Sequence, residues 1–349
     1  MDIVTREINL DVPDQFEQWK TFLELLGIAN FSGDEIDPLD YTIGLFDGDQ
    51  LVGTGSYSGN ILKYIGVSHQ HSEDGVYFNK VVSNLLTNLG QHGVFHVFVF
   101  TKPMYAKSFE HVGFKELVQS DDAAFLETGD YSITDYLESL PKVNKSENNA
   151  GIVMNANPFT DGHRYLIEQA SQASDNVYVF VVSTDKSLFT SSERLNLVKA
   201  GVSDLKNVMV VPGGDYLVSY ATFPSYFLKA QADKVRYQTT IDALIFKDWI
   251  AKHLGINVRF LGTEPNSKTT AIYNQILEKI LPPQVEVKVI KRDQNDGKVI
   301  SARTVRQAIK DNQISSIKNI VPKTTYQFIV DHKDDLQERI KKGMKISGN

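Results

Sequence analysis

The loop from Asn155 to His163 has the residue types needed to bind phosphate, in the order N-A-N-P-F-T-D-G-H. It lies between a short apolar stretch at 151–154 and a helix expected from about His163 to Ser174. Helix N-termini expose unpaired amides and a positive dipole end, which suit an anion. Gly162 lets the backbone approach a ligand closely, and Thr160 and His163 add a hydroxyl and an imidazole. The same residues also form ordinary turns and helix caps, so local chemistry leaves both interpretations open.

A second segment predicts a matching helix start. Ser301 is expected to cap a helix, and Arg303 and Arg306 then project near its first turn. Amides, a hydroxyl and two permanent cations at one strand-to-helix junction suit the β- and γ-phosphates of a triphosphate. The alternative is a surface helix with exposed arginines.

The elements that must position these loops follow a regular pattern after Ala150. Short apolar stretches alternate with helical segments, which predicts parallel βαβ units and a doubly wound sheet. Ligands of such sheets bind at the carboxyl ends of the strands, so the loop after 151–154 is well placed. The expected strands are 151–154, 177–183, 208–211, 258–261 and 285–290.

The front of the chain is organised differently. A hairpin is expected at 41–55 and a third strand at 61–67, followed by a helix from Phe78 to Leu89 and a strand at 94–100. The polar segment 141–149 lacks periodicity. We therefore predict an α/β domain at 1–127, a linker at 128–148 and a second α/β domain at 149–349.

The composition limits the classes of function. The chain has 349 residues and a formal net charge of −7, with 36 basic and 43 acidic side chains. No basic cluster suggests nucleic acid as a partner. With no cysteine, thiolate metal sites and cysteine nucleophiles are excluded. No apolar run is long enough for a membrane span, and the N-terminus lacks a signal-peptide pattern, so we expect a cytoplasmic protein.

Together, the two helix starts resemble the T/HxGH and ISxTxxR motifs of the nucleotidyltransferase superfamily. Thr160 to His163 provides the first motif and Ile300 to Arg306 the second, with Arg303 where that superfamily often has Ser or Thr. The resemblance implies a Rossmann-like domain of nucleotidyltransferase type that uses ATP and Mg²⁺, without dedicated protein ligands for the metal.

The resemblance also implies a role for each residue. His163 and Thr160 would act at the α-phosphate, and Ser301, Arg303 and Arg306 would hold the leaving pyrophosphate. The remaining nucleotide contacts would come from Asn155, Asn157, Phe159, Gly162, Gly262, Thr263 and Glu264, with the last three beside the nucleoside.

Three segments narrow the resemblance to the citrate lyase ligase family: 157–166, 221–229 and 262–265. That family adenylates acetate with ATP. It then passes the acetyl group to the thiol of a phosphoribosyl-dephospho-CoA arm on the citrate lyase acyl carrier protein. ATP, acetate and that carrier protein are therefore the implied partners, with neither nucleic acid nor membrane.

Residues 1–127 resemble the GNAT acetyltransferase fold found at the front of this family. The stretch 69–76, which would bind the pyrophosphate of CoA in an active GNAT enzyme, has one glycine and two acids. We therefore expect this domain to help dock the CoA-like arm rather than to act as an acetyltransferase. The alternatives are another adenylyltransferase of the pantetheine phosphate type, a GNAT N-acetyltransferase with a degenerate nucleotide-binding domain, and a non-catalytic regulator that binds acyl carriers.

Overall fold

The structure is a computed structural model, and it describes residues 3–68, 74–143, 148–183, 187–217, 226–227, 231–263, 268–291, 294–295, 298–344 and 346. The chain divides into two compact units. The first unit comprises Met1–Tyr136 and Phe223–Ile241, and the second comprises Leu137–Thr222 and Asp242–Asn349. The segment Phe223–Ile241 thus belongs with residues far from it in sequence, a grouping that the domain prediction did not include. The boundaries at 127 and 149 stay a prediction.

A mixed β-sheet forms the centre of the first unit. Its strand order is β1-β2-β3-β4-β5-β7-β6, and β4 pairs with β5 in parallel while the other neighbours are antiparallel. Alternating apolar residues in these strands face two layers of helices. The strands are β1 (Val4–Glu7), β2 (Tyr41–Asp47), β3 (Gln50–Ser58), β4 (Ile61–Val67), β5 (Val97–Thr101), β6 (Lys115–Gln119) and β7 (Ala124–Thr128).

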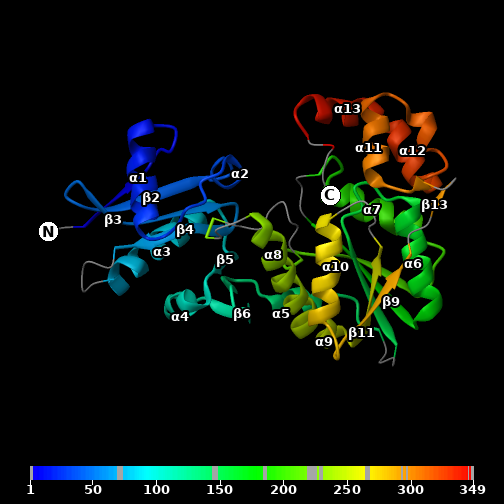
Figure 1. Ribbon diagram of the computed structural model, residues 1–349, viewed down its shortest axis with the longest axis horizontal. Coiled ribbons are helices and arrows are strands. Elements are labelled where there is room, and N and C mark those ends of the chain that lie inside the picture. Colours follow the sequence, from blue (N-terminus) through cyan, green and yellow to red (C-terminus); the bar gives the residue numbers. More distant parts are fainter. Residues whose placement is uncertain are drawn as a thin grey trace. The chain divides into compact units, whose positions relative to one another are not determined.

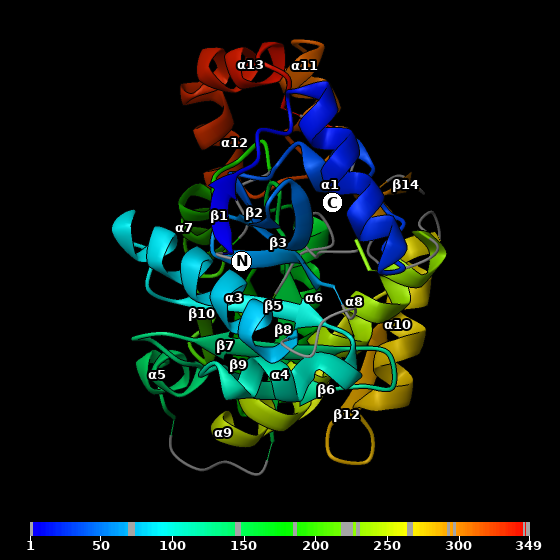
Figure 2. The same ribbon diagram turned by 90° about the vertical axis from the view of Figure 1, so that its left-hand side faces the viewer.

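Helices cover both faces of this sheet. One core contains Trp19 and Leu23 of helix α1 with Tyr64 and Tyr226, and the other contains Val81 and further side chains of α3 and α4. Strands β2 and β3 lie between α1 and α3 in both ribbon views (Figures 1 and 2). The helices are α1 (Pro13–Leu25), α2 (Gly33–Ile36), α3 (Asp74–Gln91), the 3-10 turn η1 (Pro103–Tyr105), α4 (Ala106–His111) and α5 (Ile133–Ser139), the last reaching into the second unit.

The second unit contains a parallel sheet with the strand order β10-β9-β8-β11-β12. The chain runs from β8 out to β10 and then returns to the other side of β8 with β11. The order therefore reverses between β8 and β11, which is where doubly wound sheets bind ligands. The strands are β8 (Asn149–Met154), β9 (Asn176–Val181), β10 (Val208–Pro212), β11 (Ile256–Gly262) and β12 (Glu286–Ile290), with a separate hairpin of β13 (Gln294–Asn295) and β14 (Lys298–Val299).

Helices flank the parallel sheet, and α6 and α10 lie on opposite sides of β9 and β11 (Figure 1). Three C-terminal helices, α11 to α13, pack into the same core as α6 and α7. The helices are α6 (Asp161–Ala173), α7 (Ser191–Gly201), α8 (Gln231–Ile245), the π-helical turn η2 (Phe246–Ala251), α9 (Lys252–Leu254), α10 (Lys268–Ile280), α11 (Ala302–Lys310), η3 (Ile314–Ile317), α12 (Lys323–Asp331) and α13 (Lys333–Lys341); α8 begins in the first unit.

The observed fold confirms the predicted class. The front unit has the mixed sheet with a central helix that the GNAT resemblance implied, and the second unit has the predicted doubly wound parallel sheet. The predicted hairpin and the strand at 61–67 agree with β2 to β4, whereas the strand expected at 94–100 begins only at Val97. None of the described helices is both long and apolar enough to cross a bilayer.

Close packing against the loop after β8 makes the stability of the fold sensitive to substitution of one glycine. A Cβ at Gly201, the last residue of α7, would lie 2.5 Å from Cε1 of the fully buried Phe159. We expect Gly201→Ala to lower the free energy of unfolding by about 1–3 kcal/mol because the core must shift. The measurement is thermal unfolding of the full chain.

Gly90→Ala in α3 is the matched control, since the nearest atom to its Cβ would be a Phe95 ring carbon at 3.6 Å. It should leave the midpoint unchanged or raise it, because alanine favours helix over glycine by roughly 0.5–1 kcal/mol. Equal midpoints for the two variants would contradict this account of Gly201.

Candidate active site

A cavity of about 230 Å³ lies in the second unit, at the reversal between β8 and β11. Its walls come from the loops after β8, β11 and β12 and from the starts of α6 and α11. Two motifs that lie far apart in sequence therefore share one cavity. The predicted residues that line it are Asn155, Asn157, Thr160, Gly162, His163, Gly262, Ser301, Arg303 and Arg306.

Thr160 and His163 form a reciprocal cap at the start of α6. The Thr160 hydroxyl accepts from the His163 amide, and the Thr160 amide donates to His163 Nδ1 at 3.1 Å. A backbone N–H cannot accept, so the Nδ1 atom of the neutral ring must be the acceptor and Nε2 carries the proton. His163 lines the cavity and carries its ring proton on Nε2, and the helix cap fixes the orientation of the ring.

The two helix starts also provide amides for an anion. The Asp161 amide donates to the carbonyl of Ile320 at 3.1 Å, whereas the amides of Gly162 and Ala302 have no hydrogen-bond partner among the described residues. Both residues line the cavity. A Cβ on Gly162 would lie 3.5 Å from the Ile300 carbonyl oxygen, an ordinary contact. Internal packing therefore does not by itself require glycine here, so we attribute its absent side chain to access from the cavity.

Arg306 connects the two motifs directly. Its Nη1 donates to the carbonyl of Asn157, and its Nε donates to the carbonyl of Ile346 at 2.9 Å. The side chain is only 2% exposed, and burial together with the neighbouring Arg303 charge lowers the pKa of Arg306 to about 10. The guanidinium therefore stays charged at neutral pH while it holds the loop after β8 against α11.

A second buried arginine supports the same loop from below. Arg194 of α7 is fully buried, and its Nη1 donates to the backbone oxygen of Asn155 at 2.9 Å and to its side-chain oxygen at 2.8 Å. The side-chain oxygen of Asn157 in turn accepts from the Phe189 amide at 3.2 Å. Both predicted asparagines thus use their side-chain oxygens inside the protein and shape the loop.

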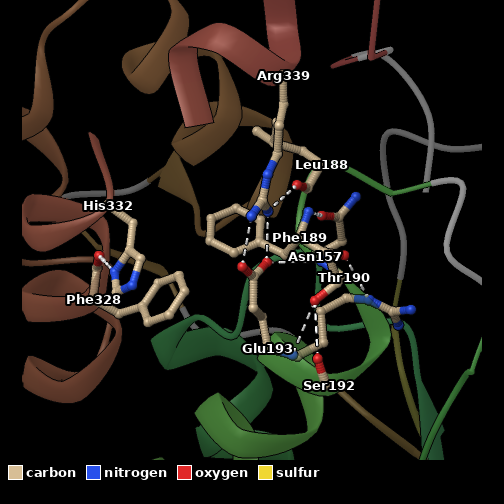
Figure 3. Close-up of polar contacts among 10 residues, drawn as sticks. Asn157, Leu188, Phe189, Thr190, Ser192, Glu193, Phe328, His332 and Arg339 are labelled. Atoms are coloured by element: carbon tan, nitrogen blue, oxygen red, sulfur yellow. Dashed lines mark hydrogen bonds and ion pairs between the residues drawn. The ribbon is translucent and has the colours of Figure 1, made fainter. Parts of the chain in front are cut away.

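An ion pair fastens the C-terminal helix α13 beside this loop, as Figure 3 shows. Arg339 donates from both terminal nitrogens to the Glu193 carboxylate at 2.7 and 2.8 Å, and it also reaches the Leu188 carbonyl. Glu193 completes a capping box with Thr190 at the start of α7. Burial opposes ionisation of Glu193, but the hydrogen bonds from Arg339 and Thr190 outweigh it and place its pKa below the usual value.

Two predicted site residues, Phe159 and Thr263, are not among the described residues that line the cavity. Phe159 is fully buried and does not line the cavity; its ring stacks at 6.0 Å on His163. The burial of its aromatic ring stabilises the fold, and its expected nucleotide contact stays a prediction. The Thr263 amide donates to the Ile290 carbonyl, and Thr263 is not among the described residues that line the cavity. Glu264 lies outside the described residues.

Sequence reasoning also missed part of the wall. Tyr273 and Asn274 of α10 line the cavity, and the Asn274 side chain donates to the Gly262 carbonyl at 3.1 Å. The sequence signal for these two residues was their position on the helix that follows the loop predicted to lie beside the nucleoside. In the described part of the chain no group of three His, Cys, Asp or Glu residues is arranged to hold a metal ion.

Comparison with known proteins gives consistent matches. A family model described as citrate lyase ligase C-terminal domain matches residues 149–329. The citrate (pro-3S)-lyase ligase of Escherichia coli (strain K12) is 35% identical over 314 residues, which cover 86% of this chain and 89% of the relative. That of Klebsiella pneumoniae is 36% identical over 288 residues, covering 80% and 84%.

Among solved structures, an aminoglycoside 6'-acetyltransferase type Ii aligns with 36% of this chain and 96% of its own. Its identity is 16% and its TM-score 0.31, which is too low to support an argument about the fold.

The Arg339–Glu193 pair predicts a pH-dependent contribution to stability. Glu193→Gln should lower the free energy of unfolding at pH 7 by roughly 1–3 kcal/mol, since it removes charge-assisted hydrogen bonds. The folded-state pKa of Glu193 is depressed, so this stabilisation is present above the unfolded pKa of about 4.3 and is lost as the pH falls through the folded value. Denaturant unfolding between pH 3 and 7 measures it.

Glu338→Gln is the matched control. Glu338 pairs with Lys342 at 2.7 Å on the exposed side of the same helix α13, where solvent screens the attraction, so its loss should cost much less. A loss at pH 7 that is as large for Glu338→Gln as for Glu193→Gln, or a loss for Glu193→Gln that persists undiminished at pH 3, would contradict the account.

Proposed function

The chain belongs to the citrate lyase ligase family, and we propose that the cavity of its second unit adenylates acetate with ATP. The acetyl group then passes to the thiol of the CoA-like prosthetic arm on the citrate lyase acyl carrier protein. The observation that carries this proposal is the meeting of two helix starts at one cavity, with the amides of Gly162 and Ala302 and the side chains of His163, Ser301 and Arg303 along its wall.

The electrostatics of that wall support a polyanionic substrate. Arg303, Arg306 and Lys291 line the cavity, and none of the described lining residues is Asp or Glu. This arrangement occurs in a chain whose formal net charge is −7. A local positive site in an acidic protein binds phosphate through placed cations and amides.

The first step needs no general base, because acetate is an anion at neutral pH and attacks as it is. A carboxylate oxygen forms a bond to the α-phosphorus, and the bond from that phosphorus to the bridging oxygen of pyrophosphate breaks. Catalysis then consists of holding the reactants in line and stabilising charge on the phosphoryl oxygens. His163 Nε2–H and the Gly162 amide donate to the α-phosphate, and Arg303 and the Ala302 amide hold the leaving pyrophosphate.

Mg²⁺ would neutralise charge on the triphosphate when bound. Asn, Thr, Ser and Tyr side chains and backbone groups make up the oxygen donors of the described lining. This donor set fits a metal that binds mainly to phosphate oxygens and keeps several waters. Ser301 and Thr160 are the residues that would contact such a hydrated ion.

In the second step the thiol sulfur of the arm attacks the acetyl carbon, the thiol proton goes to solvent and AMP leaves. We assign the arm to a cavity of about 420 Å³ in the first unit. In the described chain the parallel strands β4 and β5 pair over a short stretch only, with Ile61 opposite Phe98 and Leu62 opposite Val99. Val67, Thr101 and Tyr226 are among the residues that line the cavity. The elongated, uncharged pantetheine part of the arm suits this cavity.

His163→Ala tests the adenylylation site. We expect acetate-dependent ATP–pyrophosphate exchange to fall by about 10²- to 10³-fold, the effect of removing one preorganised donor. His163→Gln should recover part of the rate, because its amide can donate. Circular dichroism and thermal unfolding check that the helix cap has not collapsed.

His332→Ala controls for loss of a histidine elsewhere in the second unit. His332 bonds to the Phe328 carbonyl and stacks on the Phe328 ring at 4.1 Å, so exchange should be unaffected. Near-normal exchange by His163→Ala would remove His163 from the mechanism.

Ser108→Phe tests the assignment of the arm. Ser108 of α4 lines the cavity of the first unit, and a phenyl group there would fill the space. We expect kcat/KM for carrier acetylation to fall roughly tenfold, equivalent to about 1.4 kcal/mol of lost binding, while acetate-dependent exchange stays unchanged. Ser83→Phe on the exposed face of α3 is the control. Full carrier acetylation by Ser108→Phe would refute the assignment.

A further inference from the structure

Tyr273 has two distinct environments. The residue lines the cavity of the second unit, while its hydroxyl is bound in the interior. The hydroxyl donates to Asp242 Oδ2 at 2.8 Å and accepts from Arg259 Nη2 at 3.5 Å, at the limit of hydrogen-bond distance. The hydroxyl thus links a residue of the cavity wall to the buried carboxyl group of Asp242 and the buried guanidinium of Arg259.

The acid and the base are unusually deep for charged residues. Arg259 is 1% exposed and Asp242 is 7% exposed. Arg259 projects from β11, and its guanidinium lies 4.2 Å from the centre of the Phe246 ring. Its Nε and Nη1 have no hydrogen-bond partner in the described structure. The cluster therefore retains much of the desolvation cost of its charges.

The local helix geometry explains how these groups meet. Asp242 and Phe246 are four residues apart, on the last turn of α8 and the start of the π-helical turn η2, so they occupy one helix face. Burial raises the pKa of Asp242, and the Arg259 charge and the Tyr273 hydrogen bond oppose that shift. Burial also raises the pKa of Tyr273, so its hydroxyl remains a donor at neutral pH.

Stability alone gives a weak reason for such a cluster. Burial of charged groups costs desolvation free energy, and their replacement by apolar residues of similar volume is often neutral or stabilising. What the cluster does achieve is restriction of the Tyr273 ring, since its hydroxyl is held from two sides. The neighbouring Asn274 adds a second restraint through its bond to the Gly262 carbonyl, so this stretch of wall is fixed to the end of β11.

The position of this wall indicates its ligand. The helix starts of α6 and α11 take the phosphates in the proposed function, and α6 follows β8. Tyr273 and Asn274 lie on α10, which follows β11 across the reversal of strand order. A nucleotide whose phosphates rest on the helix starts has its flat, neutral base left to contact the other wall.

We propose that Tyr273 is a nucleoside-binding residue whose ring packs against the base of ATP, and that Asp242 and Arg259 are positioning residues that fix this ring. The inference rests on the proposed function for the placement of the phosphates. It assigns to one side chain the recognition of the part of ATP that the two motifs do not contact.

Binding measurements on the full chain test this assignment without requiring turnover. Calorimetry with Mg·ATP should give a Kd about 5- to 100-fold higher for Tyr273→Ala, the range expected for loss of one base–aromatic contact. Tyr273→Phe should lose less, because the ring remains. Inorganic pyrophosphate, which lacks a base, should bind the wild type and both variants equally.

Positioning by Asp242 has its own readout. Asp242→Asn can still accept from the Tyr273 hydroxyl and should retain ATP affinity, whereas Asp242→Ala should weaken ATP without affecting pyrophosphate. Tyr326 of α12 is a partly buried tyrosine that packs against the core of the second unit. Tyr326→Phe is the matched control and should bind ATP normally.

The possible results distinguish a failure of the Tyr273 assignment from a failure of the proposed function. Unchanged ATP affinity in Tyr273→Ala, or parallel losses for ATP and pyrophosphate, overturns the assignment of Tyr273 alone. Wild-type protein that binds ATP but shows no acetate-dependent exchange overturns the proposed function and leaves the nucleoside contact standing. Wild-type protein that does not bind ATP overturns both.

Discussion

A buried guanidinium joins the two loops that form the cavity of the second unit. Arg306 of α11 donates to the carbonyl of Asn157, which precedes it by 149 residues. A charge taken out of water must keep its hydrogen bonds, because breaking such a contact leaves an uncompensated cation. Thr160 and His163 lie shortly after Asn157 in the same loop and helix start. Their placement relative to Ser301 therefore depends on the hydrogen bond between Arg306 and Asn157. The starts of α6 and α11 line one cavity for the same reason.

Other buried arginines repeat this arrangement at different depths. Arg194 holds the loop through Asn155, and Arg259 lies under the wall formed by Tyr273. Arg306 and Arg194 donate to carbonyl and amide oxygens, and Arg259 donates to a tyrosine hydroxyl. Fixed positive charge around a cavity without acidic lining, in the described part of the chain, is what preorganised stabilisation of a phosphoryl group requires.

The sequence was most informative where the relevant residues are close together in the chain. Strand and helix patterns predicted the doubly wound sheet, and the two motifs predicted both helix starts and the Ser301 cap. The contacts that hold these parts together escaped prediction, because residues such as Glu193 and Arg339 are 146 positions apart. The packing of the Phe159 ring against Gly201, 42 positions further along the chain, was likewise not evident from the motif.

The grouping of Phe223–Ile241 with the first unit shows the same limit. The segment follows β10 in sequence, and only packing of Tyr226 on Tyr64, at 4.6 Å between ring centres, reveals where it belongs. Periodicity describes which face of an element is apolar but not which core that face joins.

The central claim is that acetate attacks the α-phosphorus of ATP in this cavity, and isotope transfer tests it most directly. Turnover with acetate labelled in both oxygens with oxygen-18, ATP and the carrier protein should place one labelled oxygen in AMP, because the bond made to phosphorus survives when the acetyl group leaves. Mass spectrometry of the products decides the matter. Label in inorganic phosphate or pyrophosphate, or unlabelled AMP alongside acetylated carrier, would contradict the account.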